Sequence, residues 1–147
     1  MIRIEKMQAC HCSDVAKLEA ECFSLPWSEN AIRSELSNPL SLWLVALKDD
    51  VLIGYVGSQS VMDEADMMNL AVKDSYRRMG IGEGLISILV EKLKEREVRS
   101  LTLEVRASNL PAIALYEKMG FLQVGRRPGY YRNPKEDALI LRKEWSL

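Results

Sequence analysis

The sequence predicts an α/β (α+β) protein with one mixed central β-sheet flanked by helices. Strand-like and helix-like patterns alternate along the chain, and no internal repeat or low-complexity tract interrupts them. At 147 residues the chain has the length of one ordinary domain and is short for two. We therefore expect residues 1–147 to form a single domain without an internal linker.

The N-terminal segment predicts a strand followed by a helix. Residues 1–7 alternate between apolar and polar side chains, as a half-buried strand does. Ser13 or Asp14 can cap the helix that follows, which ends near Pro26. Its apolar side chains stand at three- and four-residue spacing: Val15, Leu18 and Cys22.

A second, short helix and three strands should follow. Ser28 has the side chain of an N-cap, and Trp27 before it can pack on Ile32 as a hydrophobic staple. Asn38–Pro39 ends this helix. Two apolar runs separated by Asp49–Asp50 have the pattern of a hairpin, and the acidic segment 63–66 then turns the chain into a third strand. These strands are expected at residues 41–48, at residues 51–60, and up to Val72.

The second half of the chain alternates helices and strands. The helix after Gly82 is amphipathic, so it should pack on the sheet. Its apolar face comprises Leu85, Ile86, Leu89, Val90 and Leu93. A buried strand over residues 100–105 precedes another helix, which Asn109 or a neighbour caps. Pro111 lies in its first turn and Gly120 ends it. The last two strands are expected around residues 121–127 and 138–143.

The turn before the amphipathic helix has the composition of a phosphate-binding loop. It consists of Arg77-Arg78-Met79-Gly80-Ile81-Gly82 and directly follows the apolar run 67–72. Glycines let the backbone approach a ligand closely, and the first amides of a helix have no carbonyl partner within it. These amides and the arginines would attract the same anion, which indicates a phosphorylated cofactor. An ordinary strand-to-helix connection with surface arginines is the alternative.

Two common nucleotide motifs do not match this turn. It lacks the Gly-Lys-Ser/Thr ending of a P-loop, which disfavours hydrolysis of nucleoside triphosphates. A dinucleotide-binding fingerprint would need its third glycine where the chain has Leu85.

Composition argues against several classes of partner. Lys and Arg number 20 against 21 Asp and Glu, so no overall basic field points to nucleic acid or to a membrane. No segment resembles a signal peptide or reaches membrane-spanning length, and we expect a cytoplasmic protein.

The three cysteines fit a reducing compartment better than a disulfide framework. Cys10-His11-Cys12 together with Cys22 suggests a metal site at first sight. Their spacing differs from that of structural zinc, however, and Cys22 falls on the apolar side of a predicted helix. We expect buried or loop thiols and no bound metal.

Four motifs in order span nearly the whole chain. They are Phe23-x-x-Pro26-Trp27-Ser28; Arg77-x-x-Gly80-x-Gly82; Leu103 to Asn109 continuing to Ala114-Leu115-Tyr116 and Gly120-Phe121; and Tyr130-Tyr131-x-x-Pro134-x-x-Asp137-Ala138. The second resembles the signature of the GNAT superfamily of acetyl-CoA-dependent N-acetyltransferases. The others resemble its bacterial RimI type, which acetylates the N-terminal alanine of a small-subunit ribosomal protein. The resemblance implies a GNAT fold and acetyl-CoA as the acyl donor.

The resemblance also implies a cofactor site, position by position. Leu70, Ala71 and Val72 would offer backbone groups to the pantetheine arm, and Asn109 would touch the cofactor near its thioester. The pyrophosphate would lie on the signature that Arg77 opens, held by the amides of Arg78, Met79, Gly80, Ile81, Gly82 and Glu83. Glu83 departs from the small or basic residue of many relatives, and its carboxylate should cost some attraction for phosphate.

Two residues match the family's catalytic positions. Glu104 matches the proposed general base, which a nearby cation such as Arg106 could keep ionised, and Tyr116 matches the general acid that protonates the thiolate. A free α-amine, with a reference pKa of about 7.7–8.0, needs only a modest base. The alternatives are structural: Glu104 could merely pair with Arg106 or another basic side chain, and Tyr116, three residues after Ile113, could be a core residue.

Aromatic residues could form a groove for the acceptor. Trp27, Tyr130 and Tyr131 are rigid amphipathic rings expected on loops. Packing at an edge is the alternative for all three, and for Trp27 the staple is favoured. The acidic stretch of Asp63, Glu64 and Asp66 could draw a basic peptide, although a solvated loop is the default interpretation.

The sequence therefore predicts an acetyl-CoA-dependent protein N-terminal acetyltransferase. The acceptor is expected to be the N-terminal alanine of a small-subunit ribosomal protein. It should attack directly in a ternary complex, since no cysteine falls at the motif positions. Two alternatives stay open: a GNAT enzyme acting on lysine side chains or a small amine, and a non-enzymatic acyl-CoA-binding sensor or partner subunit.

Overall fold

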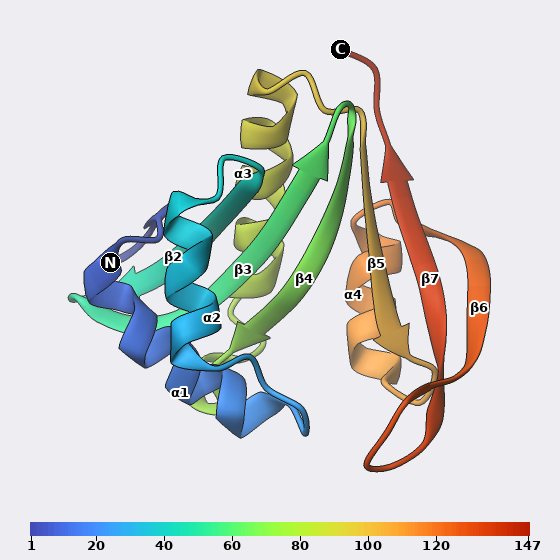
Figure 1. Cartoon of the computed structure of the whole chain (residues 1–147), viewed down its shortest axis with the longest axis horizontal. Helices are drawn as coiled ribbons and strands as arrows, with labels where there is room; N and C mark the ends of the chain where they lie inside the picture. The colour runs from blue at the N-terminus through green and yellow to red at the C-terminus, as the bar shows by residue number, and fades with distance from the viewer.

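A computed structural model describes all 147 residues and contains one seven-stranded sheet (Figure 1). The strands are β1 (Ile2–Lys6), β2 (Ser41–Lys48), β3 (Val51–Val61), β4 (Glu64–Val72), β5 (Ser100–Arg106), β6 (Leu122–Tyr131) and β7 (Glu136–Glu144). Their order in the sheet is β1-β2-β3-β4-β5-β7-β6. Only β4 and β5 pair in parallel, whereas all other neighbours are antiparallel, so the predicted mixed sheet is confirmed.

Helices cover both faces of the sheet. They are α1 (Cys12–Cys22), α2 (Glu29–Ser34), α3 (Ile81–Glu95) and α4 (Leu110–Lys118), with short 3-10 turns at Ala9–His11, Glu35–Ser37 and Asp74–Tyr76. Figure 1 shows α1 and α2 in front of β2 and β3, and α3 and α4 behind the sheet. No helix combines the length and the apolar composition that a membrane crossing requires.

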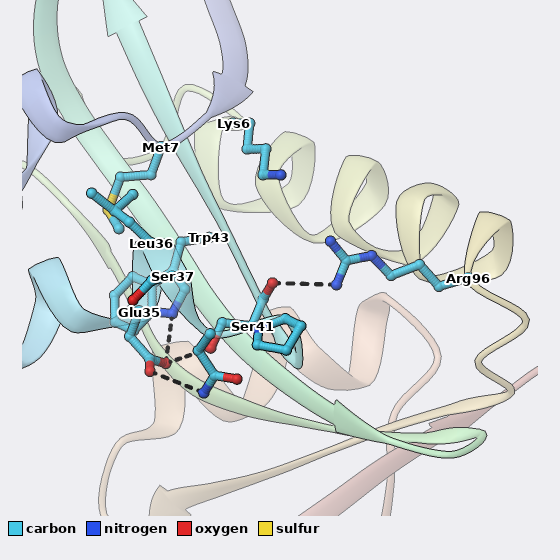
Figure 2. A pocket seen from close by; sticks show the side chains of 10 residues that line it. Lys6, Met7, Glu35, Leu36, Ser37, Ser41, Trp43 and Arg96 are labelled. Atoms are coloured by element: carbon cyan, nitrogen blue, oxygen red, sulfur yellow. Dashed lines mark hydrogen bonds between the residues drawn. The ribbon is translucent and has the colours of Figure 1, made fainter.

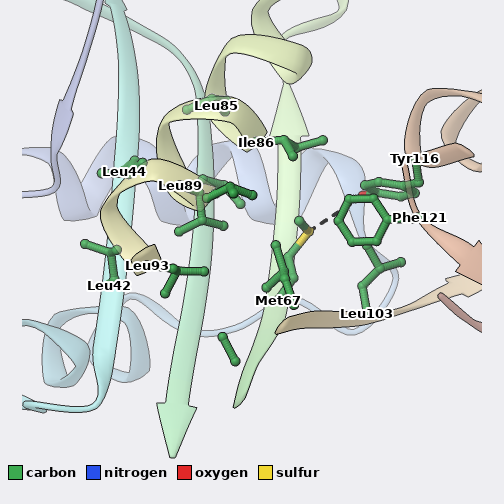
Figure 3. Close-up of a cluster of buried hydrophobic side chains, with 14 of the residues drawn as sticks. Leu42, Leu44, Met67, Leu85, Ile86, Leu89, Leu93, Leu103, Tyr116 and Phe121 are labelled. Atoms are coloured by element: carbon green, nitrogen blue, oxygen red, sulfur yellow. Dashed lines mark hydrogen bonds between the residues drawn. The ribbon is translucent and has the colours of Figure 1, made fainter. Parts of the chain in front are cut away.

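Two apolar clusters follow from this layering. The larger contains the predicted apolar face of α3, which is fully buried against β2, β3 and β4 (Figure 3). It also contains Tyr116 of α4 and Phe121, whose rings meet edge to face. The smaller cluster joins α1 and α2 to the other face of β2 and β3 through Val15, Leu18 and Ile32. The two clusters hold the sheet rigidly where it supports the motifs.

The pairing between β4 and β5 is unusually short. It covers only Glu64 with Ser100, Ala65 with Leu101 and Asp66 with Thr102. Beyond these pairs the two strands diverge toward their C-terminal ends (Figure 1). β4 is also bulged, because its partners on β3 pass from Met67 to Asn69 and leave Met68 unopposed. Beyond Asp66 and Thr102, the facing edges of β4 and β5 therefore form no backbone pairing with each other.

The capping predictions were partly correct. Ser28 Oγ accepts a 3.1 Å hydrogen bond from the Ala31 amide, and Asn109 Oδ1 accepts one of 3.3 Å from the Ala112 amide, so both N-caps are confirmed. For α1 the prediction was wrong: the helix begins at Cys12 after a 3-10 turn, which places Ser13 and Asp14 inside its first turn.

Several strand boundaries also differ from the prediction. The acidic segment does not precede β4 as a loop, because Glu64 and Asp66 lie within the strand and the turn is made at Met62. β6 extends to Tyr131, so Tyr130 and Tyr131 end a strand and do not lie on a loop. β6 is extended because it pairs with β7 as far as Tyr131 and Glu136. The apolar pattern of β6 is too short to predict this pairing from the sequence.

A close contact beside the bulge gives a stability prediction. Gly57 pairs with Asn69 of the bulge, and a Cβ at Gly57 would lie 2.5–2.6 Å from atoms of the Trp43 indole. Gly57→Ala should therefore lower the free energy of unfolding by about 1–3 kcal/mol, because the buried indole must move. Chemical denaturation measures this, with exposed Val61→Ala on the same strand as the control. Equal stability of the two variants would contradict the close approach.

Candidate active site

The glycine turn has the backbone geometry of an anion cradle. Gly80 is the N-cap of α3 with φ 77°, a left-handed conformation that favours glycine, and Arg78 has φ 64°. The Gly84 amide donates to the Gly80 carbonyl, so the amides before Gly84 have no carbonyl of α3 to bind. These N–H groups lie at the positive end of a 15-residue helix dipole.

The two arginines of the turn differ in position. The Arg77 guanidinium donates to the Val72 carbonyl at 3.3 Å and pairs with Asp74 at 3.0 Å. It braces the end of β4, and its part in binding a ligand stays a prediction. Arg78 is exposed and forms no ion pair within the chain. Arg78 is thus the free cation of the turn.

Lys118 balances the carboxylate of Glu83. Its Nζ lies 2.8 Å from Glu83 Oε1, and this contact joins the first turn of α3 to the last residue of α4. The same helices approach closely at Gly82, where an added Cβ would lie 3.3 Å from Leu115 Cδ2. The predicted cost of Glu83 to phosphate attraction is therefore reduced by a cation that the sequence places 35 residues away.

Leu70, Ala71 and Val72 form the end of β4 beside the turn. On one side they pair with Val56, Tyr55 and Gly54 of β3. On the other side they have no strand partner, because β5 has already diverged. Asn109 lies exposed at the start of α4, where its side-chain oxygen caps that helix.

Tyr116 lies at the point where the strands diverge. Its side chain is 7% exposed, and its hydroxyl donates to Met67 Sδ at 3.8 Å, directly before the unopposed residue of the β4 bulge (Figure 3). Burial raises the pKa of the Tyr116 phenol above its usual range, with a further increase from Tyr131. The hydroxyl is therefore a neutral donor, and Tyr116 is also a core residue as the structural alternative predicted.

Glu104 lies on the face of β5 opposite to the one that packs toward Tyr116. It alternates with buried Leu103 and Val105, and its side chain remains 31% exposed. The cation nearest to it is Arg127 of β6, whose Nε lies 3.7 Å from Glu104 Oε1. Arg106, the example named for this cation, instead binds the β6–β7 turn, so the partner of Glu104 is another basic side chain, as the structural alternative allowed.

The aromatic residues predicted to line a groove fall into two groups. Trp27 packs edge to face on Trp43 at 5.4 Å in the cluster that contains Ile32, which agrees with a packing role. Tyr130 and Tyr131 contact each other at 5.1 Å. Burial, and next the charge of nearby Glu104, raises the pKa of Tyr131 to about 12.

One structural residue near the site was missed by the sequence analysis. Glu19 is fully buried in α1, where its carboxylate accepts hydrogen bonds from the Tyr55 hydroxyl, from Asn69 Nδ2 at 2.8 Å, and from the Trp27 amide at 3.0 Å. It thereby fixes both the β4 bulge and the segment between α1 and α2. Glu19 follows the apolar residue Val15 by four positions, and this spacing could have predicted that Glu19 lies on the buried face of the helix.

A second buried carboxylate borders a hollow of the surface. Glu35 accepts hydrogen bonds from Ser41, Trp43 and Gln59 at 2.7–3.1 Å. The hollow beside it, of about 210 Å³, has Lys6 and Arg96 at its rim (Figure 2). Arg96 is the C-cap of α3, whereas the glycine turn lies at the N-terminal end of that helix. Glu35 is satisfied by these neutral donors, so it anchors β2 and β3 to the preceding 3-10 turn.

The cysteines are dispersed. Cys10 is exposed, Cys12 is buried and Cys22 is half-buried, and burial raises the pKa of the latter two thiols. No three side chains of His, Cys, Asp or Glu are grouped as ligands of a metal ion.

Comparison with known proteins assigns the family. Residues 12–121 match the model of the acetyltransferase (GNAT) family, and the chain belongs to that family. Two relatives are similar to the chain over most of its length. The [ribosomal protein bS18]-alanine N-acetyltransferase of Escherichia coli (strain K12) is 37% identical over 126 residues, which cover 84% of each chain. A Bacillus subtilis (strain 168) protein with a proposed activity of the same name is 44% identical over 128 residues, covering 86% of this chain and 85% of the relative.

Solved structures agree with this assignment. The crystal structure of the ribosomal-protein-S18-alanine N-acetyltransferase from Escherichia coli superposes with a TM-score of 0.91 at 34% identity, covering 100% of this chain and 96% of the other. Arabidopsis thaliana NAA60 in complex with acetyl-CoA shares the fold, with a TM-score of 0.89 at 20% identity over 98% of each chain. The predicted GNAT fold is confirmed.

The environment of Tyr116 predicts how the protein titrates with alkali. Because burial holds the Tyr116 phenol neutral, Tyr116→Phe should leave unchanged the number of phenols that ionise around pH 10. Ultraviolet difference absorbance of the folded protein measures this number. In the comparison variant Tyr131→Phe, a component near pH 12 should disappear. Loss of a component near pH 10 in Tyr116→Phe would contradict the burial of the hydroxyl.

Proposed function

We propose that the chain transfers the acetyl group of acetyl-CoA to the N-terminal alanine of a bS18-type ribosomal protein. The observation that carries this proposal is the placement of Glu104 and Tyr116 on the two faces of the sheet where β4 and β5 diverge. The named relatives at 37–44% identity support the choice of acceptor. Such an acceptor would place the enzyme in the cytoplasm.

Acetyl-CoA would be held by the glycine turn and the free edge of β4. The amides of residues 78–83 and the Arg78 guanidinium would bind the pyrophosphate, while Leu70 to Val72 would contact the pantetheine arm. Asn109 at the start of α4 would lie near the thioester. The bound cofactor supplies an activated acetyl group. No metal is needed for this chemistry, because neutral donors and a carboxylate suffice.

Glu104 would act on the acceptor side of the sheet. It accepts the proton of the incoming α-amine, directly or through water, because it is the carboxylate beside Tyr131 and Arg127 on that face. Arg127, whose Nε lies 3.7 Å from Glu104 Oε1, is the cation that pairs with this carboxylate. An α-amine suits this base better than a lysine side chain, since more of it is already neutral at pH 7.

Tyr116 would act from the face of the sheet that α3 and α4 cover. Its phenol remains protonated, so it can donate a proton to the departing thiolate. The attack is direct within a ternary complex, because no cysteine falls at the motif positions and burial raises the pKa of the Cys12 and Cys22 thiols, which disfavours the nucleophilic thiolate. Trp27, Tyr130 and Tyr131 would border the path of the acceptor peptide.

The decisive experiment locates the transferred label. The chain is incubated with labelled acetyl-CoA and unacetylated ribosomal proteins, and the modified residue is found by mass spectrometry. Label on the terminal alanine of the bS18-type protein supports the proposal. Label on lysine or on a small amine supports the alternative acceptors. Absence of any thiol release would support an acyl-CoA-binding sensor or partner subunit and would refute an enzymatic role.

The proposed base gives a kinetic prediction. Glu104→Gln should lower kcat/KM by roughly 10²-fold, because the amine must then lose its proton without assistance. The remaining rate should follow only the titration of the peptide's own α-amine, at about 7.7–8.0. A pH–rate profile of the peptide reaction measures both effects, with Glu117→Gln on the exposed side of α4 as the control. A profile identical to that of the unsubstituted chain would assign the base elsewhere.

The proposed acid gives a separate prediction. Tyr116→Phe should reduce turnover by roughly 10²-fold with little change in acetyl-CoA affinity, because the phenol donates only when the thiolate leaves. The ring packs on Phe121 and should stay in place, since the hydroxyl makes a single hydrogen bond, to Met67 Sδ. Steady-state kinetics, calorimetry with acetyl-CoA and the unfolding midpoint test this together. Unchanged turnover would remove Tyr116 from the mechanism.

A further inference from the structure

The Arg106 guanidinium makes several polar contacts, none of them with Glu104. Its Nη1 donates to the Pro134 carbonyl at 2.8 Å and lies 3.3 Å from Glu136 Oε1. Its Nη2 donates to the Arg132 carbonyl at 2.9 Å and to Ser24 Oγ at 3.4 Å. The side chain is only 25% exposed although it carries a full charge.

These contacts join three separate segments of the chain. Arg106 is the last residue of β5, two residues beyond Glu104 on the same face. Arg132 and Pro134 belong to the turn between β6 and β7, and Glu136 is the first residue of β7. Ser24 belongs to the segment between α1 and α2, which also contains Trp27. No other hydrogen bond or ion pair joins the β6–β7 turn to the α1–α2 segment, so the Arg106 guanidinium is the polar link between them.

The same side chain also fixes an aromatic ring beside Glu104. The guanidinium carbon of Arg106 lies 4.5 Å from the centre of the Tyr131 ring. Glu136, in turn, accepts a 2.7 Å hydrogen bond from the Ser108 amide, and its pKa is lowered by hydrogen bonds to Ser108 and then to Arg106. The turn is therefore held by a continuous set of charge-assisted bonds that starts on β5.

We propose that Arg106 is a positioning residue that ties the β6–β7 turn to the α1–α2 segment and so sets the opening through which the acceptor reaches Glu104. This inference rests on the proposed function only for its kinetic consequence. The planar guanidinium is required because it binds two carbonyls, a carboxylate and a hydroxyl at once while stacking on a ring. A lysine at position 106 would keep the charge and lose most of these contacts.

The kinetic test separates the two substrates. Arg106→Lys should raise KM for an acceptor peptide by roughly tenfold or more, because the walls of the opening lose their fixed spacing. KM for acetyl-CoA should change less than about twofold, because the glycine turn and β4 do not touch Arg106. Ser24→Ala, which removes only the link to the α1–α2 segment, should shift peptide KM in the same direction by less. Equal increases in both KM values would overturn the proposal.

A second readout does not depend on activity. Amide hydrogen exchange of the full chain should become faster in residues 23–28 and 128–136 of Arg106→Lys. The control Arg126→Gln removes an arginine that pairs with Asp137 within the same hairpin but does not reach Ser24. It should leave exchange in residues 23–28 unchanged. Unaltered exchange in residues 23–28 and 128–136 of Arg106→Lys would refute the proposal.

The two readouts distinguish the possible failures. If the unsubstituted chain acetylates no peptide N-terminus, the proposed function fails, and hydrogen exchange still tests the tie made by Arg106. If the chain is active and exchange changes while peptide KM does not, Arg106 joins the segments without setting the opening, and the proposal is wrong. Ser24→Ala keeps the test available should the lysine variant fail to fold.

Discussion

The site depends on the short parallel pairing of β4 and β5. Parallel strands usually continue side by side, but here only three residue pairs form before the strands separate. The bulge at Met68 strengthens the local twist of β4 at the same place. As a result the edge of β4 has free backbone groups, and side chains from both faces of the sheet can approach one point: Tyr116 from α4 and Glu104 from β5.

Buried and neutralised charges fix the shape of the region where β4 and β5 separate. Glu19 fixes the bulge from the front of the sheet, using hydrogen bonds from Asn69 and Tyr55. Around the glycine turn, Lys118 balances Glu83 and Asp74 engages Arg77, which leaves Arg78 as the unengaged cation. A buried carboxylate that is fully hydrogen-bonded rigidifies its surroundings, and an unpaired cation at a helix N-terminus attracts an anion. In this fold Glu19 therefore contributes to rigidity, whereas Arg78 stays open to a ligand.

Sequence patterns predicted most of the fold but only part of the site. Local signals located the N-caps Ser28 and Asn109 and the apolar face of α3, because capping and periodicity act within a few residues. They failed at the start of α1, where a 3-10 turn supplied the first turn in place of a Ser13 or Asp14 cap. They also failed for the partner of Glu104, since Arg127 is brought to it only by the pairing of β6, β7 and β5.

The sequence by itself determined the alternation of strands and helices and the glycine turn before α3, because these features depend on local backbone preference. It also supplied the candidate residues Glu104 and Tyr116, through the resemblance of their motifs to the GNAT family. Only the tertiary structure decided where the charges go: Arg77 to Val72 and Asp74, Lys118 to Glu83, and Arg106 to the turn between β6 and β7. Long flexible cations can reach many partners, and the nearest one is set by strand pairing and helix packing between distant segments.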